Sequence, residues 1–365
     1  LVSGETLDER VSTALAVRNI GLCQVKLGHT GEGRQALEKA LALYDALGSR
    51  FDLGLVHHDL GWIGELVGDL SAAVEHYQAA LARWQQLGNP GPWANTLNGL
   101  GVIYHQQGRY DEAQQALEGA LEKCQAAGDL RVEAYVWASL GDLHRDLGAY
   151  EQARQAYNEG LQGGTRAGEG FAVTYSLDAL GNVARLQGNL DQARKWLLEA
   201  MAHAEKHGSG YETGLCDTSL GILAGQEGDL VMARHHLDRA AERFEAGGFG
   251  RELARACLHR ARVAFLAGNR QEALDGVERT LDLVRRLVEA MHPHPQSRQG
   301  VGGLEVKGQV VVHKAGNAER RAIVLAQPQA HKPRHDQRTL VAQVLVRVLQ
   351  PENPPLLGQE QLQDL

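Results

Sequence analysis

The stretch NGLGVIYHQQGRYDEAQQALEGAL, residues 98–121, decides the fold because near copies of it recur along most of the chain. The glycine at its fourth position returns every 40 residues, and a seventh copy carries Ala261 in its place. The equivalent glycines are Gly21, Gly61, Gly101, Gly141, Gly181 and Gly221. A fixed period of about 20–50 residues is typical of arrays in which each unit packs mainly on its neighbours. The register therefore predicts one continuous array.

Each 40-residue unit carries two helical patterns separated by a short turn. In the second unit the first helix is expected at about 51–67 and the second at about 70–87. Apolar residues recur three and four positions apart in the first of them, which is the spacing of one helical face. These residues are Leu53, Val56, Leu60, Ile63 and Val67. Gly68 and Gly88 stand where glycine commonly ends a helix.

Small and large residues alternate between repeating positions. Gly101 and Ala113, with their equivalents, are expected to let the two helices of a unit approach closely. Leu100 and Leu117 represent the larger core positions, and Tyr77 and Tyr157 occupy the second of these sites in other units. The pattern predicts an all-α chain of about seven helix-turn-helix units.

The repeat resembles a known family. The residues that carry the resemblance are Leu100, Gly101, Tyr104, Gly108, Tyr110, Ala113, Leu117, Ala120 and Leu121. They are similar to the tetratricopeptide repeat, whose usual period of about 34 residues is shorter. The longer period resembles the sensor regions of maltose-activator-like bacterial transcription regulators and Leu-Gly-Asn-type signalling adaptors. This resemblance implies a right-handed α-α superhelix over residues 12–290.

The composition changes abruptly at Met291. Seven of the nine prolines lie in residues 291–365, and this segment has no Phe, Trp or Tyr. Such a segment is expected to be a poorly ordered tail. Two alternatives are a non-native extension, for example from a shifted reading frame, and a small β module with strands in 304–314 and 322–327. The chain also starts at Leu1 and not at Met. One hypothesis is therefore a longer protein with an effector domain upstream of this segment.

The charge distribution and the cysteines restrict the class of protein to which the chain can belong. Residues 1–290 hold 28 Lys and Arg against 39 Asp and Glu, and residues 291–365 hold 9 against 6. An acidic array disfavours direct nucleic-acid contact, which depends on basic side chains. A weaker alternative places nucleic-acid binding in the basic residues of the tail, Arg320, Arg321, Lys332, Arg334 and Arg338. The four cysteines form no CxxC pair and no run suits a membrane helix, so a cytoplasmic protein without membrane contact is expected.

No motif indicates catalysis or a bound cofactor. The glycines follow the repeat and form no phosphate-binding loop, and the 16 histidines include no HExxH arrangement. Asp142 and Asp146 lie four apart on one helix, a spacing that suits an acid and base pair, but exposed surface carboxylates are far commoner. The sequence therefore predicts a protein that is not an enzyme and has no cofactor and no metal site.

The resemblance implies that a protein or peptide binds the concave side, which is lined by the first helix of each unit. Carried over by repeat phase, the contact residues are Arg18, His58, Trp62, Glu65, Asn95, Asn98, His105, Tyr135, Asp142, Arg145, Tyr175, Asp178, Asn182 and Arg185, with Leu22, Leu55, Asp146, Gln226, Arg255 and Arg262 at neighbouring positions. Trp62, Tyr135 and Tyr175 are the expected aromatic anchors. Basic residues are not clustered with Asn95, Asn98 and Asn182, so the carboxylate clamp of some family members is not predicted.

Three hypotheses on function follow from these patterns. The leading one is a protein-interaction scaffold that binds a peptide or protein along its inner face. The second is the sensing region of a larger transcription regulator or signalling protein whose effector domain lies outside this sequence. The third, a part of an enzyme with its catalytic domain elsewhere, has the least support.

Overall fold

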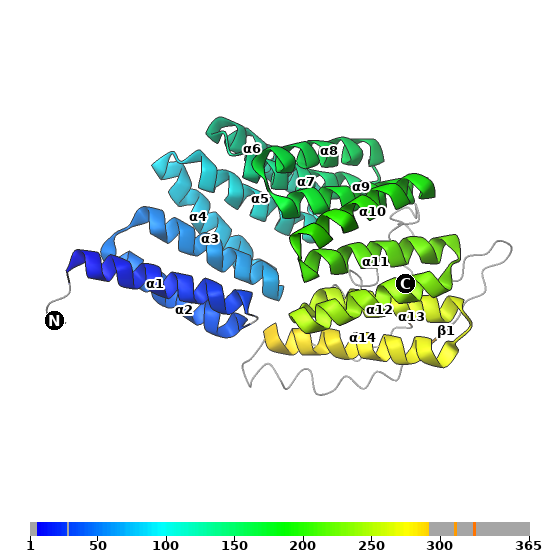
Figure 1. Cartoon of the computed structure of the whole chain (residues 1–365). Coiled ribbons are helices and arrows are strands. Elements are labelled where there is room, and N and C mark those ends of the chain that lie inside the picture. Colours follow the sequence, from blue (N-terminus) through cyan, green and yellow to red (C-terminus); the bar gives the residue numbers. More distant parts are fainter. Residues whose placement is uncertain (1–5, 28, 292–309, 312–323, 326–365) are drawn as a thin grey trace.

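The computed structural model describes residues 6–27 and 29–291 and two short strands beyond them. The helices are α1 (Leu7–Lys26), α2 (Thr30–Leu47), α3 (Arg50–Val67), α4 (Leu70–Leu87), α5 (Pro90–Gln106), α6 (Tyr110–Ala127), α7 (Leu130–Asp146), α8 (Tyr150–Ala167), α9 (Gly170–Leu186), α10 (Leu190–His207), α11 (Gly210–Glu227), α12 (Leu230–Gly247), α13 (Gly250–Leu266) and α14 (Arg270–Met291). They form seven antiparallel hairpins in chain order (Figure 1). The all-α repeat fold predicted from the sequence is confirmed.

Glycine ends the helices at regular intervals. Among the described residues, twelve glycines spaced 20 apart, from Gly48 to Gly268, have a left-handed backbone with φ between 65° and 86°. This conformation is strained for residues with a side chain but not for glycine. Gly68 and Gly88 follow directly on the predicted helix ends, so both expected stops are confirmed.

In the first six units, the repeating glycine of the first helix lies under a large side chain of the second helix. A Cβ atom placed on Gly141 would be 2.4 Å from the ring of Tyr157, and one on Gly61 would be 2.6 Å from the ring of Tyr77. Tyr157 is fully buried. The missing side chain thus lets the ring lie directly on the backbone of the first helix, as the sequence predicts.

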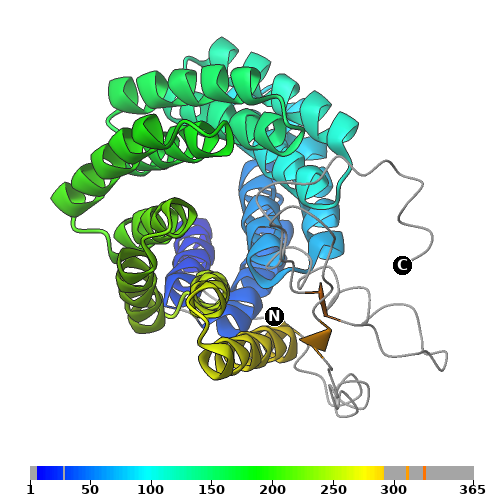
Figure 2. The ribbon, with the colours of Figure 1, turned by 90° about the vertical axis from the view of Figure 1, so that its right-hand side faces the viewer.

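The hairpins curve so that the first helices form the inner layer. Consecutive odd-numbered helices contact one another from α1 to α13, whereas in residues 6–291 no comparable contact joins consecutive even-numbered helices. Neighbours are closer on the inside of a curved stack, so the odd-numbered helices line the concave side. The array curls through about one turn, which brings α14 against α3 (Figure 2).

One face of α1 is exposed, whereas the equivalent face of the first helix in the next two units is buried. Ile20 is 55% exposed, but its equivalents Leu60 and Leu100 are 1% and 6% exposed because the preceding hairpin packs on them. Within the described part of the chain, no helix covers this side of α1. The apolar pattern of the first unit is therefore that of an internal repeat.

The expectation for residues 292–365 falls almost wholly outside the described residues. The exceptions are strand β1 (Val310–Val311) and strand β2 (Val324–Leu325), which pair antiparallel with Val310 opposite Leu325. Each lies within one of the two stretches named as candidate strands. The predictions of a poorly ordered tail, a non-native extension or a small β module otherwise concern residues outside the described ones.

The buried ring of Tyr157 makes Gly141 a position at which substitution should be damaging. We expect Gly141→Leu to lower the stability by about 1–3 kcal/mol or more, because the new side chain and Tyr157 cannot occupy the same space. Thermal unfolding followed by circular dichroism measures the loss. The matched control is Gly210→Ala, since a Cβ atom at Gly210 meets nothing within 4 Å. An unchanged melting temperature for Gly141→Leu would contradict the packing described above.

Candidate functional site

All fourteen of the principal predicted contact residues lie on the odd-numbered helices α1 to α9, which form the concave layer. The structure brings them together in three groups and leaves a few apart. The central group lies between α7 and α9, a second group between α9 and α11, and a third between α1, α3 and α5. Their role in binding remains a prediction.

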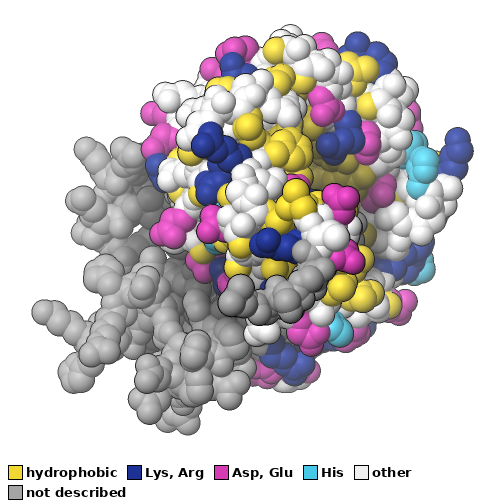
Figure 3. All heavy atoms as spheres, turned by 90° about the vertical axis from the view of Figure 1, so that its left-hand side faces the viewer, with side chains coloured by type: hydrophobic (Ala, Val, Ile, Leu, Met, Phe, Trp, Pro, Cys, Tyr) yellow, Lys and Arg dark blue, Asp and Glu magenta, His cyan; other side chains and the backbone are white. Residues whose placement is uncertain are grey.

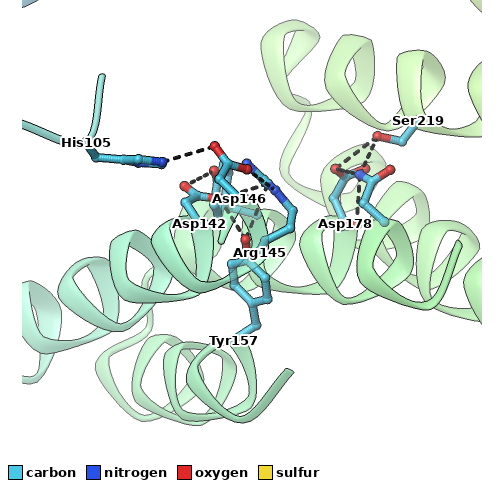
Figure 4. A network of polar contacts seen from close by, with 9 residues as sticks. His105, Asp142, Arg145, Asp146, Tyr157, Asp178 and Ser219 are labelled. Carbon is cyan, nitrogen blue, oxygen red and sulfur yellow. Dashed lines mark hydrogen bonds and ion pairs between the residues drawn. The ribbon is translucent and has the colours of Figure 1, made fainter. Parts of the chain in front are cut away.

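The central group is organised by the carboxylate of Asp142 on α7. Its Oδ1 accepts hydrogen bonds from the Tyr157 hydroxyl at 2.7 Å and from Arg145 at 2.9 Å. Its Oδ2 accepts a hydrogen bond of 2.6 Å from the hydroxyl of Tyr175, which comes from α9 (Figure 4). Asp142 is therefore held by three donors from three different helices, and the spacing that suggested an acid and base pair with Asp146 serves a structural network.

The same network extends to α5 through Asp146. Arg145 donates to Asp146 Oδ1 at 3.0 Å, and Asp146 Oδ2 lies 3.0 Å from Nε2 of His105. Burial acts to raise the pKa of Asp146, but the hydrogen bond from His105 and the charge of Arg145 outweigh it and lower the pKa. Asp146 is therefore ionised at neutral pH and links α7 to the preceding unit.

Burial also keeps the two tyrosines of the network neutral. It raises the pKa of Tyr157 and of Tyr175 well above the ordinary value, and the nearby carboxylate of Asp142 adds to the shift. A neutral hydroxyl donates a hydrogen bond to a carboxylate. Tyr157 and Tyr175 thus remain hydrogen-bond donors on the concave side at neutral pH.

The second group joins α9 to α11. Asn182 donates to Oδ2 of Asp178 at 2.9 Å and to the Ser219 hydroxyl at 3.0 Å, and Ser219 donates to Asp178 Oδ2 at 3.0 Å (Figure 4). Arg185 donates to Asn182 and to Gln226, each at 3.3 Å. The repeat phase predicted four of these five residues, and only Ser219 was missed.

The third group surrounds His58 on α3. The Asn95 amide lies 3.1 Å from His58 Nε2, and His58 Nδ1 lies 3.1 Å from the hydroxyl of Thr96. Because an amide nitrogen only donates, Nε2 accepts and Nδ1 carries the proton, which assigns a neutral ring. Arg18 of α1 donates to Asp59 at 2.6 Å beside this ring.

The remaining predicted residues stand apart from these groups. Glu65 accepts from Tyr77 at 3.5 Å and from Gln106 at 3.4 Å, and burial raises its pKa. Trp62 is partly buried against the apolar core of α1 to α3, and one side-chain oxygen of Asn98 is buried without a hydrogen-bond partner. Trp62 therefore does not lie with the other two expected anchors.

Sequence reasoning missed the aromatic residue that joins Tyr135 to Tyr175. The ring of Phe171 lies 6.3 Å from that of Tyr135, 6.0 Å from that of Tyr175 and 6.3 Å from that of Tyr211, measured between centroids. The signal was present, because Phe51, Phe171 and Tyr211 share one repeat phase. A row of aromatic rings thus follows the concave side from α7 to α11.

Sequence reasoning also missed two acidic residues buried in α11, Asp217 and Glu212. Asp217 replaces the large apolar residues that hold this phase elsewhere, such as Leu177, and it is fully buried. It pairs with His236 at 2.9 Å and with Arg243 of α12. These ion pairs within the hairpin account for the buried carboxylate without a bound ligand.

Glu212 belongs to a cavity of about 80 Å³ beside the central group. Its lining residues are Arg145, Phe171, Thr174, Tyr175, Asp178, Ala179, Asn182, Glu212, Leu215, Cys216, Thr218, Ser219, Phe244, Glu252 and Arg255. They come from α7, α9, α11, α12 and α13, so the cavity needs four consecutive units. Cavities of this kind, with apolar walls and a few polar groups, are the usual places for ligands.

The surface and the described segments limit other kinds of site. On the face shown in Figure 3, acidic and basic side chains are interspersed, and hydrophobic side chains gather around a depression. In residues 6–27 and 29–291, no three His, Cys, Asp or Glu side chains are placed to hold a metal ion. Nor does this part of the chain contain a helix long and apolar enough to cross a membrane.

Comparison with known families identifies the repeat in the middle of the chain. Two family models, each described as tetratricopeptide repeat, match residues 94–164 and 173–207. None of the curated protein sequences matches significantly. The matched segments contain the central group and most of α9.

Solved structures share the fold at low sequence identity. The Rap conjugation gene regulator of plasmid pLS20, in complex with the Phr* peptide, has a TM-score of 0.64 at 13% identity, over 84% of this chain and 81% of that one. A Rap protein complexed with competence and sporulation factor has a TM-score of 0.58 at 14% identity, over 82% and 88%. A signal-transduction ATPase with a tetratricopeptide repeat sensor from Pyrococcus horikoshii has a TM-score of 0.53 at 14% identity, over 79% of this chain and 43% of that one.

The neutral ring of His58 predicts a loss of stability in mild acid. Burial and the charge of Arg18 lower its pKa to about 4, against 6.5 for an ordinary histidine. Between these values the unfolded chain binds a proton that the folded chain does not, so the stabilisation present above pH 6.5 is lost as the pH falls toward 4. At pH 5 the loss from this residue should be about 2 kcal/mol relative to pH 7.5.

Urea unfolding followed by tryptophan fluorescence at pH 7.5 and pH 5 measures this loss. His58→Gln removes the titrating group, so its stability should fall less between the two pH values than that of the wild type. His29→Gln is the control, since the side chain of His29 is 60% exposed. Equal pH dependence in His58→Gln and the wild type would contradict the assigned neutral ring.

Proposed function

The chain is a tetratricopeptide-repeat protein, and from this premise we propose that its concave side binds an extended peptide or a segment of a partner protein. The binding is an equilibrium process without chemical change. The site is centred on α7, α9 and α11, where the aromatic row, the polar groups and the cavity lie next to one another.

The observation that carries this proposal is the coupling of polar side chains across successive units of the concave layer. Tyr175 reaches Asp142 from the next unit, and Asn182 reaches Ser219 in the same way. Side chains held in this manner lose little further freedom when a ligand binds, and fixed donors and acceptors suit the backbone of an extended peptide. The neighbouring rings of Tyr135 and Phe171 offer apolar contact area.

The structural neighbours support a peptide as the ligand. Two of them are described as complexes, one with the Phr* peptide and one with competence and sporulation factor. At 13% and 14% sequence identity, these structures show that the fold is shared and nothing more. A peptide as the ligand of this chain is therefore part of the proposal. The closeness of α14 to α3 adds to the argument, because a curled array surrounds a bound segment on several sides.

A second function is the sensing region of a larger regulator or signalling protein. The specific observation in its favour is the likeness to the ATPase with a repeat sensor, of which this chain covers 43%. Mass spectrometry of the natural polypeptide tests it. Peptides from an adjoining nucleotide-binding or DNA-binding domain would support the sensor, and a natural polypeptide without such a domain would contradict it.

The aromatic row provides the mutational test of peptide binding. A synthetic array of random heptapeptides should yield sequences that the wild type retains, and the double variant Tyr135→Ala, Tyr175→Ala should bind them at least about tenfold more weakly, since buried aromatic anchors contribute about 2 kcal/mol or more each. Trp62 is left unchanged because it packs on the core.

Tyr110→Ala is the matched control, because Tyr110 is 39% exposed on α6 of the outer layer. Circular dichroism should show the same helix content in all variants. Retention of the same peptides by the double variant with unchanged affinity would overturn the proposed site, and so would failure of the wild type to retain any peptide.

A further inference from the structure

The cavity between α9, α11 and α13 contains a carboxylate without a partner. Glu212 is only 8% exposed, and its Oε2 is buried without a hydrogen bond. Within residues 6–27 and 29–291, no ion pair and no side-chain hydrogen bond to its carboxylate is formed, and only its backbone N–H is satisfied, by Ser209. Burying an ionised group without compensation costs several kcal/mol.

The other carboxylates of the cavity are satisfied. Asp178 accepts hydrogen bonds from Asn182 and Ser219. Glu252 lies 3.4 Å from Arg251 and accepts from the hydroxyl of Tyr211 at 3.5 Å. Glu212 is therefore distinguished from its neighbours by its lack of a partner, and not only by its acidity.

The basic residues that line the cavity do not serve Glu212. Arg145 is held by Asp142 and Asp146 at 2.9 and 3.0 Å. Arg255 is exposed, in contrast to the buried Glu212. The Oε2 atom of Glu212 thus remains available to a cationic group that enters from outside.

The walls of the cavity suit a flat cation. Phe171, Tyr175 and Phe244 line it together with Leu215, and the Phe171 and Tyr175 rings are stacked with centroids 6.0 Å apart. A guanidinium group binds to aromatic faces and forms paired hydrogen bonds with a carboxylate. Apolar walls around one charged group also strengthen the attraction by excluding water.

We propose that this cavity receives a cationic side chain of the bound peptide, best matched by arginine, with Glu212 as its counter-ion. The inference rests on the proposed peptide-binding function and names the residue type that the site selects. Glu212 is then a specificity-determining residue. The cost of leaving its carboxylate unpaired in the free protein is offset when the ligand arrives.

The test uses a single blocked residue, so that the cavity is examined apart from the rest of the peptide site. N-acetyl-arginine methylamide is titrated into the full chain, and binding is followed by NMR. N-acetyl-citrulline methylamide, which has nearly the same shape without the charge, is the comparison ligand. Alanine methylamide with a free amino group distinguishes a peptide N-terminus from a side chain as the source of the cation.

The wild type should bind the arginine probe about tenfold more tightly than the citrulline probe, as expected for one charge-assisted pair. Glu212→Gln should abolish this preference, whereas Glu199→Gln, an exposed residue on α10, should retain it. The free Glu212→Gln variant should also have a higher melting temperature than the wild type, because a buried carboxyl group without a partner is replaced by a neutral amide.

Equal binding of the arginine and citrulline probes by the wild type would overturn the inference, as would an unchanged preference in Glu212→Gln. Tighter binding of alanine methylamide than of the arginine probe would indicate that the cavity binds a peptide N-terminus and not a side chain. This result would also overturn the inference. A lower melting temperature of Glu212→Gln would show that Glu212 stabilises the free fold, and it would overturn the inference as well. None of these results affects the retention of heptapeptides, so the proposed function is judged separately.

Discussion

The array depends on the contact between a glycine of the first helix, present in six of the seven units, and a large side chain of the second helix. Tyr157 lies on the backbone at Gly141, and Leu117 lies on that at Gly101 in the same way. This contact fixes how closely the two helices approach and how they are rotated about their axes. Because the first six units repeat it at the same interval, their hairpins have nearly the same shape. Identical hairpins stacked in register then produce regular curvature.

The concave site is a consequence of that curvature. The tighter contact between odd-numbered helices brings together residues of successive units that are far apart in sequence. Tyr175 and Asp142 are separated by 33 positions and His105 and Asp146 by 41, yet both pairs lie within hydrogen-bond distance. A change in the shape of one hairpin would therefore disturb polar pairs on both sides of it. The network and the glycine contact are parts of one construction.

The fold could be predicted from the sequence because the same pattern of helix-packing residues recurs in seven successive units at a fixed period. The helix ends followed from glycine, and the inner-layer residues followed from repeat phase. The pairing of side chains could not be predicted in the same way. Asp142 and Asp146 look like an exposed pair at helical spacing, and only the approach of Tyr157, Tyr175 and His105 shows that they are occupied. These contacts depend on side-chain rotamers and on the distance between units, which the period does not specify.

Departures from the repeat were the part of the sequence that held the most information about the site. In α11, Glu212 and Asp217 are two buried carboxylates on one helix, five positions apart. Asp217 faces α12, where His236 and Arg243 neutralise it within its own hairpin. Glu212 faces the cavity between units and has no such partner. The same type of side chain therefore stabilises the fold on one side of the helix and leaves an unsatisfied carboxyl oxygen on the other. An array built from equal units can contain such a group because the neighbouring hairpins supply the stability that this position gives up.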